Sequence, residues 1–527
     1  PAENYAVKTG IHPAKSTSEN VATMIRQLKR IGCMYDWEKM VNTSTPEYYR
    51  WTQWLFLQMF EKGLAYRKEG LVNFCPSCQT VLANEQVHEG RCDRCETEVV
   101  QKPLTQWYWR ITDYSQQLLD NLHALDWPEK TKTMQRNWIG RKEGINIAYE
   151  VQDSKEKIVC FTTRPDTNFG ATFIVLSPEH EFVKKMLIGA LTPPDRKLAG
   201  HVRAYVEAAT KKTELQRQEE GRLKTGVFTG FNAINNLNGK KLSIWVADFV
   251  LSTVGTGAVV GVPGHATRDF EFAKEFNLPI VRVVVASDKD TTPIERMEQV
   301  QEAEGTMINS DFLNGLDIHE ATQKIMDHLE QKGWGKRIVT HRLRDWCISR
   351  QRYWGALIPI VYDPAGKPHP IPEEHLPWLL PTDVAFKPTG TSPIAESKEL
   401  FARTEKIFGK GWTPEVDTMD TFVCSSFYSN MYLSTPGYGV KCQKSIVNCS
   451  LIDPQIEERW LPVNMYIGGA EHACMHLIYA RFVQMALKDF GFVSHEEPYQ
   501  RLVHQGVITN KGAKMSKSKG NVVSPDG

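Results

Sequence analysis

The sequence predicts an α/β protein that has a main core and two inserts, a small cysteine-bound ribbon and a separate domain of alternating strands and helices. Three observations support this fold class. Apolar residues recur at helical spacing before residue 62, and aromatic-rich helices and parallel-type strands return after residue 339. Two CxxC pairs lie between residues 71 and 102. Short β-branched runs begin after Gly140.

Length and composition are those of a multidomain globular protein. Single cores stop growing at about 250 to 300 residues, so a chain of 527 residues is expected to hold several domains. A net charge of +1 means that any nucleic acid would have to be held by local basic patches. No run of about 18 apolar residues predicts a membrane-spanning helix. The eleven cysteines are an odd number and are mostly scattered, which favours a reducing compartment.

Two helices come first in chain order. Apolar positions at helical spacing predict them over 19–31 and 46–62, and Gly63 stops the second. The ribbon follows at 71–102. In the next domain the pattern predicts strands at 145–151, 158–163, 172–176, 242–250 and 257–262, and helices at 179–188, 201–210 and 268–276. Later in the chain, proline and glycine indicate a surface insert at 364–417.

Four cysteines have the spacing of a structural zinc site. Two CxxC pairs with thirteen residues between them are formed by Cys75, Cys78, Cys92 and Cys95. Four thiolates close a tetrahedral zinc site and leave no position for water, so the zinc ion would be structural rather than catalytic. A redox pair or four ordinary buried cysteines is the alternative.

A lysine-rich loop near the C-terminal end has the composition of a polyphosphate-binding loop. Residues 511–521 carry four lysines, two serines and two glycines after an apolar strand-like run. Lysine ammonium groups act as mobile charges on phosphate oxygens, and serine hydroxyl groups donate hydrogen bonds to them. The candidate contacts are Lys514, Met515, Ser516, Lys517 and Ser518. A solvated basic surface loop is the alternative.

A glycine-rich turn at 467–476 is the second candidate site, because it follows a short strand and opens a helix. Its candidate ligand-binding residues are Gly468, Gly469, Glu471, His472 and His476. The glycines let a ligand approach the helix N-terminus, and the two histidines are expected on one helix face. A nucleotide would then lie with its ribose and phosphates near Glu471 and His476. A core or capping role for the histidines is the alternative. A zinc protease is not indicated, because the glutamate precedes the first histidine.

Residues 344–355 interleave three arginines with three aromatic residues. This composition suits stacking on a sugar or base together with pairing to phosphate. An interdomain layer of salt bridges would have the same composition and is the alternative.

A third constellation lies in the inserted domain and has two halves that are distant in the sequence, at 162–167 and 255–269. The hydroxyl and methyl groups of threonines such as Thr163 and Thr167 can gauge the size of a side chain and bind an attacking water, and Asp269 can hold an α-ammonium group. A turn plus a helix cap is the alternative, with Asp269 in the first turn of a helix. No nucleophile elbow is present, so covalent acyl-enzyme chemistry is not indicated.

Taken together, these motifs resemble those of class I aminoacyl-tRNA synthetases, and nearly the whole chain is similar to bacterial-type leucyl-tRNA synthetases. The string KMSKS at 514–518 is that family's signature loop. TTRPDT at 162–167 and SRQRYWG at 349–355 are shared with isoleucyl and valyl enzymes. The leucyl resemblance depends on the insert's position after the ribbon and on longer matches at 1–4, 48–63, 79–86, 134–140, 418–422 and 467–476.

The resemblance implies a Rossmann-type catalytic core, incomplete here, with an inserted zinc ribbon and an inserted α/β-barrel editing domain. It divides the chain into catalytic core at 1–70, zinc ribbon at 71–102, connective and catalytic residues at 103–144, editing domain at 145–338, the second half of the core at 339–513 and the signature loop at 514–527. A cytoplasmic monomer would activate leucine with ATP and Mg²⁺, pass it to tRNA(Leu), and hydrolyse mischarged tRNA. The resemblance gives Lys514 and Lys517 roles on the pyrophosphate. It makes Thr167 the steric block against leucine and Asp269 the holder of the amino group.

Departures from the family pattern limit what the chain is expected to do. No HxGH string occurs, and no cysteines stand at 404–414. Ala266 and Asn168 stand where the family often has an acidic residue and a leucine, and Phe427 replaces a tryptophan in the pocket segment 425–428. We expect a fragment without the HIGH motif and the anticodon-binding domain, which edits but does not aminoacylate. A free-standing deacylase, an isoleucyl- or valyl-type synthetase and a non-catalytic RNA-binding zinc-ribbon protein are the alternatives.

Overall fold

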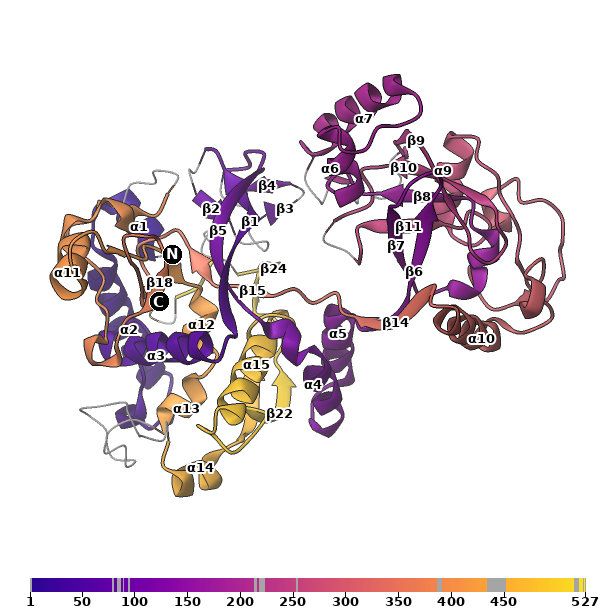
Figure 1. Ribbon diagram of the computed structural model, residues 1–527. Helices are drawn as coiled ribbons and strands as arrows, with labels where there is room; N and C mark the ends of the chain where they lie inside the picture. Colours follow the sequence, from indigo (N-terminus) through magenta and orange to yellow (C-terminus); the bar gives the residue numbers. More distant parts are fainter. Residues whose placement is uncertain are drawn as a thin grey trace. The chain divides into compact units, whose positions relative to one another are not determined.

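The chain forms two compact units (Figure 1). A computed structural model describes residues 2–77, 80–82, 87–88, 90–92, 95–212, 216–217, 223–252, 255–385, 391–433, 452–515, 521–524 and 526. The first unit combines Pro1–Ile139 with Leu343–Gly527, and the second unit is Gly140–Arg342. Each unit has its own hydrophobic core. None of the described helices is both long and apolar enough to cross a membrane.

Three helices open the first unit. They are α1 (Ala2–Thr9), α2 (Pro13–Arg30) and α3 (Pro46–Glu61). Proline stands at the start of α2 and α3, where its missing N–H would be unpaired in any case. Gly63 follows α3 with φ of 75°, as its predicted stop requires. The helices predicted at 19–31 and 46–62 are confirmed, although α2 begins earlier because His12 accepts a hydrogen bond from Ala14 N and caps it.

A four-stranded sheet carries the cysteine ribbon. Its strands are β1 (Ala65–Cys75), β2 (Thr80–Leu82), β5 (Val100–Trp109) and β15 (Trp346–Cys347), in the order β15-β5-β1-β2. β1 and β5 pair antiparallel from Ala65 opposite Trp109 to Phe74 opposite Val100. Their far ends meet the short pair β3 (Val87–His88) and β4 (Arg91–Cys92). The long strands therefore hold the ribbon at one end (Figure 1).

The first unit also contains a parallel strand pair. β21 (Val463–Gly468) and β22 (Tyr499–His504) run parallel, and α15 (His476–Asp489) connects them. Other helices are α4 (Ser115–Asp120), α5 (Glu129–Ile139), α11 (Lys398–Phe408), α12 (Thr421–Ser425), α13 (Tyr428–Tyr432) and α14 (Pro454–Trp460). Other short strands are β16 (Ser349–Arg350), β17 (Ile360–Tyr362), β18 (Pro368–Pro370), β19 (Thr413–Pro414), β20 (Thr418–Met419), β23 (Thr509–Asn510) and β24 (Ala513–Lys514).

The segment 364–417 is not the surface insert that its composition predicted. Ile371, Trp378, Ile394 and Leu400 are buried in the main hydrophobic cluster of the first unit. Proline and glycine shape the turns of this segment, but its apolar side chains fill the core.

The second unit is an open, mixed sheet covered by helices. Its strands are β6 (Lys142–Val151), β7 (Lys157–Thr162), β8 (Phe173–Leu176), β9 (Val227–Ile234), β10 (Lys241–Val246), β11 (Ala258–Gly261) and β14 (Gly335–Thr340), with β12 (Val284–Val285) and β13 (Thr306–Met307) as a separate pair. Within the described ranges its longer helices are α6 (Glu181–Leu187), α7 (Arg196–Ala209), α9 (Thr267–Glu275) and α10 (Ile318–Gln331).

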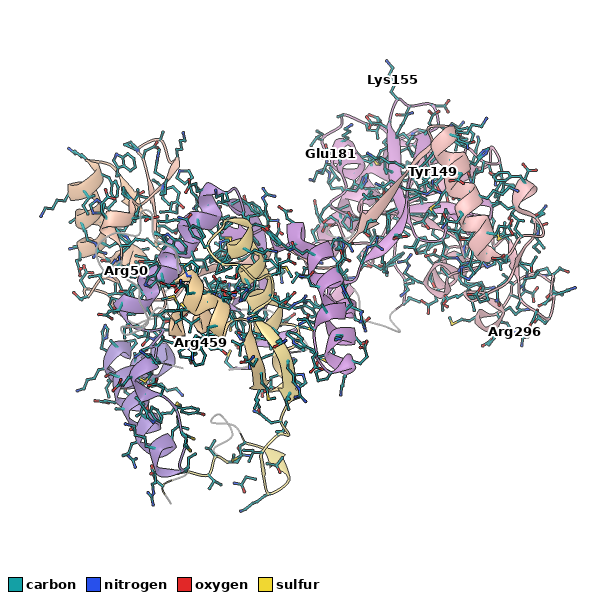
Figure 2. The ribbon with its side chains drawn as sticks, turned by 90° about the horizontal axis from the view of Figure 1, so that it is seen from below. Arg50, Tyr149, Lys155, Glu181, Arg296 and Arg459 are labelled. Carbon is teal, nitrogen blue, oxygen red and sulfur yellow. The ribbon has the colours of Figure 1, made fainter. Side chains whose placement is uncertain are left out.

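The α/β barrel expected for this unit is replaced by a sheet with two ends. The strand order is β11-β8-β10-β9-β6-β14, and β7 pairs with β6 beside this path. A barrel requires the two end strands to pair with each other. Within the described ranges, β11 pairs with β8 and β14 pairs with β6, so the hydrogen-bonded path stays open. Tyr149 of β6 lies inside this unit and is fully buried, whereas Lys155 projects from the β6–β7 turn (Figure 2).

Candidate functional sites

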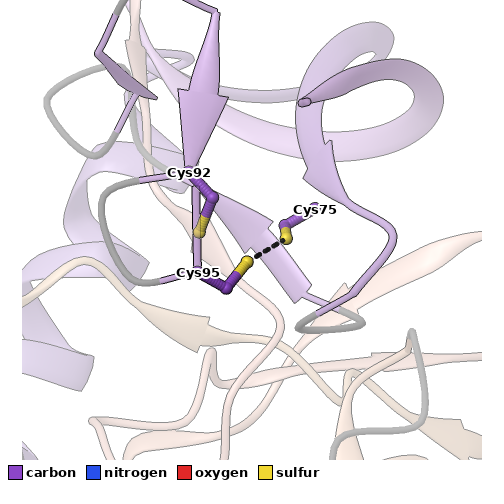
Figure 3. Close-up of side chains that lie close together, drawn as sticks. All are labelled: Cys75, Cys92 and Cys95. Atoms are coloured by element: carbon purple, nitrogen blue, oxygen red, sulfur yellow. Dashed lines mark hydrogen bonds between the residues drawn. The ribbon is translucent and has the colours of Figure 1, made fainter. Parts of the chain in front are cut away.

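Three of the four predicted zinc ligands converge at the end of the ribbon. Cys75, Cys92 and Cys95 have their sulfur atoms within 4.8 Å of one another (Figure 3). Cys75 Sγ and Cys95 Sγ lie 3.4 Å apart, close to the separation of about 3.8 Å for two thiolates on one tetrahedral zinc ion. Glu96 N donates to Cys92 O at 2.9 Å, a turn that brings Cys95 back beside Cys92. Cys78 lies outside the described residues.

The glycine-rich turn lies at the carboxyl end of β21, where ligands of parallel α/β sheets bind. Gly469 leaves room for the Glu471 carboxylate, since a Cβ atom there would collide with Glu471 Oε2. The expectation that both histidines lie on one helix face is wrong in detail. His472 belongs to a separate 3-10 turn, and α15 begins at His476. Their rings are nevertheless neighbours, with centroids 6.2 Å apart.

Three tyrosines from different segments enclose His476. Tyr428 stacks on its ring at 5.9 Å, Tyr466 lies at 5.8 Å, and the Tyr499 hydroxyl is 3.4 Å from Nε2. Burial, reinforced by nearby His472, lowers the pKa of His476 to about 4, so its imidazole is neutral at pH 7. The enclosure is therefore aromatic and uncharged.

Sequence reasoning placed Tyr428 in a pocket segment but missed Tyr466 and Tyr499. Tyr466 stands two residues before Gly468, so strand alternation puts both on the same side of β21 and was the available signal. Nothing in the sequence placed Tyr499 beside His476, because β22 follows α15 by a connection whose direction the pattern does not encode.

The arginine- and aromatic-rich segment 344–355 is partly structural. Trp346 stacks on Tyr479 at 3.9 Å and donates through Nε1 to Asp420 Oδ2 at 3.1 Å. Arg350 donates to the same oxygen at 2.7 Å. These buried contacts lie within the first unit, so this part of the segment is a structural layer of that unit and not the interdomain layer of the alternative.

The end of the same segment reaches a small cavity. Trp354 and Gly355 line a space of about 110 Å³ together with Thr421 and Cys424 of α12. Glu3, from the start of the chain, accepts hydrogen bonds from Tyr353 N at 3.1 Å and Trp354 N at 3.3 Å. The first residues of the chain thus fix the backbone beside this cavity.

The lysine-rich loop is described only at its start. The backbone of Lys514 lies in β24 opposite Thr509, and Met515 follows it. Ser516, Lys517 and Ser518 lie outside the described residues.

Strand pairing brings together the two halves of the threonine–aspartate constellation. The loop that contains Thr167 ends at β8, and the segment that leads to Asp269 begins at β11. β8 and β11 pair antiparallel with Phe173 opposite Gly261, so both loops emerge at the same end of the pair. Gly261 is required there because the Phe173 ring occupies the position of a Cβ atom.

Glu302, which sequence reasoning missed, joins the two halves directly. Its carbonyl oxygen accepts from Arg164 at 2.9 Å, and its carboxylate accepts from the Thr267 hydroxyl at 2.6 Å. The hydrogen bonds from Thr267 lower the pKa of Glu302. Arg164 also pairs through Nε and Nη2 with the buried Asp166 carboxylate, at 3.0 and 2.8 Å. No motif marks Glu302, which lies in a loop far along the chain.

The predicted hydrolytic residues differ in exposure. Thr163 is exposed, whereas Thr167 is buried and donates through its hydroxyl to Arg164 O at 2.9 Å. Asp269 is also buried, and it does not cap its own helix. Its Oδ2 accepts from Val262 N at 3.0 Å, and its Oδ1 accepts from Arg268 at 3.0 Å. The Arg268 side chain is 46% exposed, so this cation covers the carboxylate from the solvent side.

Asn168, which stands where the family often has a leucine, is buried and hydrogen-bonded on both its side chain and its backbone. Asn168 Oδ1 accepts from the Tyr149 hydroxyl at 2.6 Å, and Asn168 O accepts from Asn235 at 2.8 Å. A leucine at this position could not accept the hydrogen bond from the Tyr149 hydroxyl. Asn168 therefore satisfies a buried donor that would otherwise have no partner here.

Two family models and several curated proteins match this chain. The family model described as tRNA synthetases class I (I, L, M and V) matches residues 7–149 and 317–527, and the model of the leucyl-tRNA synthetase editing domain matches residues 136–330. The chain is 51% identical over 527 residues to leucine–tRNA ligase of Clostridium perfringens strain 13 and 50% identical to that of Clostridium beijerinckii. All of this chain and 62% of each relative are covered, so the chain spans about three fifths of their length.

The chain is also similar to a solved structure. It is the ternary complex of Agrobacterium radiobacter K84 agnB2 LeuRS with tRNA and LeuAMS, with a TM-score of 0.80 and 36% identity. The similarity covers 100% of this chain and 60% of that chain.

Proposed function

The chain belongs to the class I tRNA synthetases, and from that premise we propose that its protein joins leucine to tRNA(Leu) with ATP and hydrolyses tRNA(Leu) that carries a wrong amino acid. A monomer acting with Mg²⁺ is the form that we propose. The first unit is the site of synthesis and the second unit is the site of hydrolysis.

The observation that carries the synthetic half is the aromatic enclosure beside the glycine-rich turn. The nucleotide would bind at the turn that follows β21, with Glu471 and His472 near the ribose and phosphates, while Gly469 leaves the room that the Glu471 carboxylate occupies. The uncharged, aromatic surroundings of His476 would favour an apolar side chain such as that of leucine beside them over a charged one.

The lysine-rich loop is proposed to act on the leaving group. The ammonium groups of Lys514 and Lys517 would stabilise charge that develops on pyrophosphate, with Met515, Ser516 and Ser518 as further contacts. Mg²⁺ supplies further positive charge on the phosphate oxygens when ATP is bound.

Hydrolysis is needed because a hydrophobic pocket separates amino acids that differ by one methylene by only about 1 to 3 kcal/mol. We assign Asp269 to the α-ammonium group of the esterified amino acid, which would replace Arg268 on Oδ1. Exposed Thr163 would contact the attacking water, and Thr167 would limit the size of the amino acid side chain.

The test is incubation of the chain with isoleucyl-tRNA(Leu). We expect the ester bond to be hydrolysed by the wild-type chain and preserved by the D269N variant, because the amide cannot balance an ammonium charge. H319Q, which changes an exposed histidine of the same unit, serves as the control and should hydrolyse normally. A wild-type chain that leaves the ester intact would contradict the hydrolytic assignment.

We also propose a structural zinc ion held by Cys75, Cys78, Cys92 and Cys95. The convergence of three thiol groups within 4.8 Å supports this ligand set. When bound, zinc would cross-link strands that bury only a small cluster of apolar residues.

A further inference from the structure

Helix α5 holds the glycine-rich turn from both ends. The hydroxyl group of Thr131 lies 2.6 Å from His504 Nε2, and His504 Nδ1 lies 2.9 Å from the carbonyl oxygen of Gly468. At the other end of the turn, Gln135 Nε2 donates to the carbonyl oxygen of Ala473 at 2.7 Å. The residues between these two carbonyl groups include Gly469, Glu471 and His472. The turn is therefore clamped by one helix.

The hydrogen bonds of His504 have a defined direction. The carbonyl oxygen of Gly468 can only accept, so Nδ1 must carry the proton that it donates. In the neutral imidazole Nε2 is then an acceptor, and the Thr131 hydroxyl donates to it. The imidazole thus transmits the position of α5 to the backbone of the turn.

Gln135 is itself held in place by a buried cation. Arg481 donates through Nη1 to Gln135 Oε1 at 2.7 Å, which leaves the amide nitrogen of Gln135 facing Ala473. Arg481 is fully buried and makes two further bonds to Glu497, at 2.8 and 2.7 Å. Thr131 and Gln135 are also buried, and His504 between Thr131 and Gly468 is partly buried.

We propose that Thr131, Gln135 and His504 are positioning residues that set the shape of the nucleotide-binding turn. They touch no proposed substrate atom, and they act through the carbonyl groups of Gly468 and Ala473. The proposal rests on the function proposed above, because it assumes that the turn binds the nucleotide part of leucyl adenylate. The helix that clamps the turn is also the last element before the chain enters the second unit at Gly140.

The test uses two substitutions of His504 that each keep one half of the link. H504N keeps a donor at the Nδ1 position and loses the contact with Thr131. H504Q keeps a polar group at the Nε2 position and loses the contact with Gly468. If α5 sets the shape of the turn through this side chain, both variants and T131V should bind 5′-O-(N-leucylsulfamoyl)adenosine roughly 5- to 50-fold more weakly in calorimetry. The double variant T131V/H504N should bind no more weakly than H504N, because both changes break the same link.

T404V is the matched control. Thr404 is equally buried, and its hydroxyl donates to Leu400 O at 2.9 Å within α11. T404V should lose a comparable hydrogen bond but keep the wild-type affinity. Equal loss of affinity in T404V and T131V, or wild-type affinity in H504N, would overturn the proposal.

Hydrogen exchange separates this proposal from the proposed function. The backbone amides of 468–476 should exchange faster in T131V and H504N than in the wild type, and they should be unchanged in T404V. If the wild-type chain binds no adenylate analogue, the nucleotide site is wrong, and the exchange rates still decide whether α5 holds the turn. Unchanged exchange in T131V and H504N would contradict the clamp itself.

Discussion

Burial holds His265 in a single protonation state. Its Nε2 accepts from Val283 N at 2.8 Å and Val284 N at 3.2 Å, and its Nδ1 donates to Gln301 O at 2.9 Å. Only the neutral ring can accept at Nε2. Burial, opposed by the bond to Gln301, lowers the pKa of His265 to about 4. This side chain lies four residues before Asp269 and fixes the loop that leads to it.

The lowered pKa predicts a pH dependence of stability. The unfolded histidine titrates near 6.5, so the unfolded state binds the proton first and the folded state loses stability as the pH falls from about 6.5 to 4. The full loss amounts to about 3 kcal/mol. H265Q should reduce the slope of melting temperature against pH in this window, and H319Q, at an exposed histidine, should leave it unchanged. Equal slopes for wild type and H265Q would show that His265 is not the titrating group.

At the scale of elements, one buried arginine ties four segments together. Arg481 of α15 bonds Glu497 before β22, Gln135 of α5 and the carbonyl oxygen of Leu118 in α4. No single-residue pattern distinguishes this arginine from a surface one. The contribution of Arg481 to stability depends on three partners that are distant from one another in the sequence.

Removal of this arginine should be strongly destabilising. R481L leaves the Glu497 carboxylate largely buried without its partner, and such a loss costs about 3 to 5 kcal/mol of unfolding free energy. R501L removes an ion pair with Asp126 in which both side chains are more than half exposed, and it should cost less than about 1 kcal/mol. Urea denaturation measures both. A loss below about 1 kcal/mol for R481L would contradict the structural role.

The ribbon predicts a metal dependence at the same scale. The wild-type chain should contain about one zinc ion by mass spectrometry of the metal, because four thiolates complete one tetrahedral site. C92S should lose most of it, and C33S, at a cysteine outside the cluster, should retain it. Retention of zinc by C92S would place the metal elsewhere.

At the scale of the whole molecule, the chain has two independent cores. The largest cluster of the first unit is formed by residues on both sides of the insert, and the main cluster of the second unit lies wholly within Gly140–Arg342. The chain passes between the units only at 139–140 and 342–343. Separate cores joined by two short crossings are expected to unfold separately.

Two unfolding transitions should therefore appear in calorimetry. R481L should lower the temperature of one transition, and H265Q should lower the other, because the two residues belong to different units. A single transition that both variants shift equally would show that the units unfold as one.

Many of the candidate site residues could be recognised from short-range sequence patterns. The glycines at 468 and 469, the two CxxC pairs and the TTRPDT string each lie within a few residues, so their chemistry could be recognised without a fold. Helix positions followed from the 3.6-residue period, as α3 shows. The strands β9 and β14 and the helix α10 were missed, and β10 was extended past Val246, because strand limits depend on pairing.

The amino-acid sequence by itself determined the family, the chemical composition of each motif and the order of the inserts, because these depend on neighbours along the chain. Only the tertiary structure decided that Glu302 joins Arg164 to Thr267, that tyrosines enclose His476, and that α5 clamps the glycine-rich turn. Such contacts join residues far apart in the chain, and their formation depends on which surfaces are buried together rather than on any repeat in the sequence.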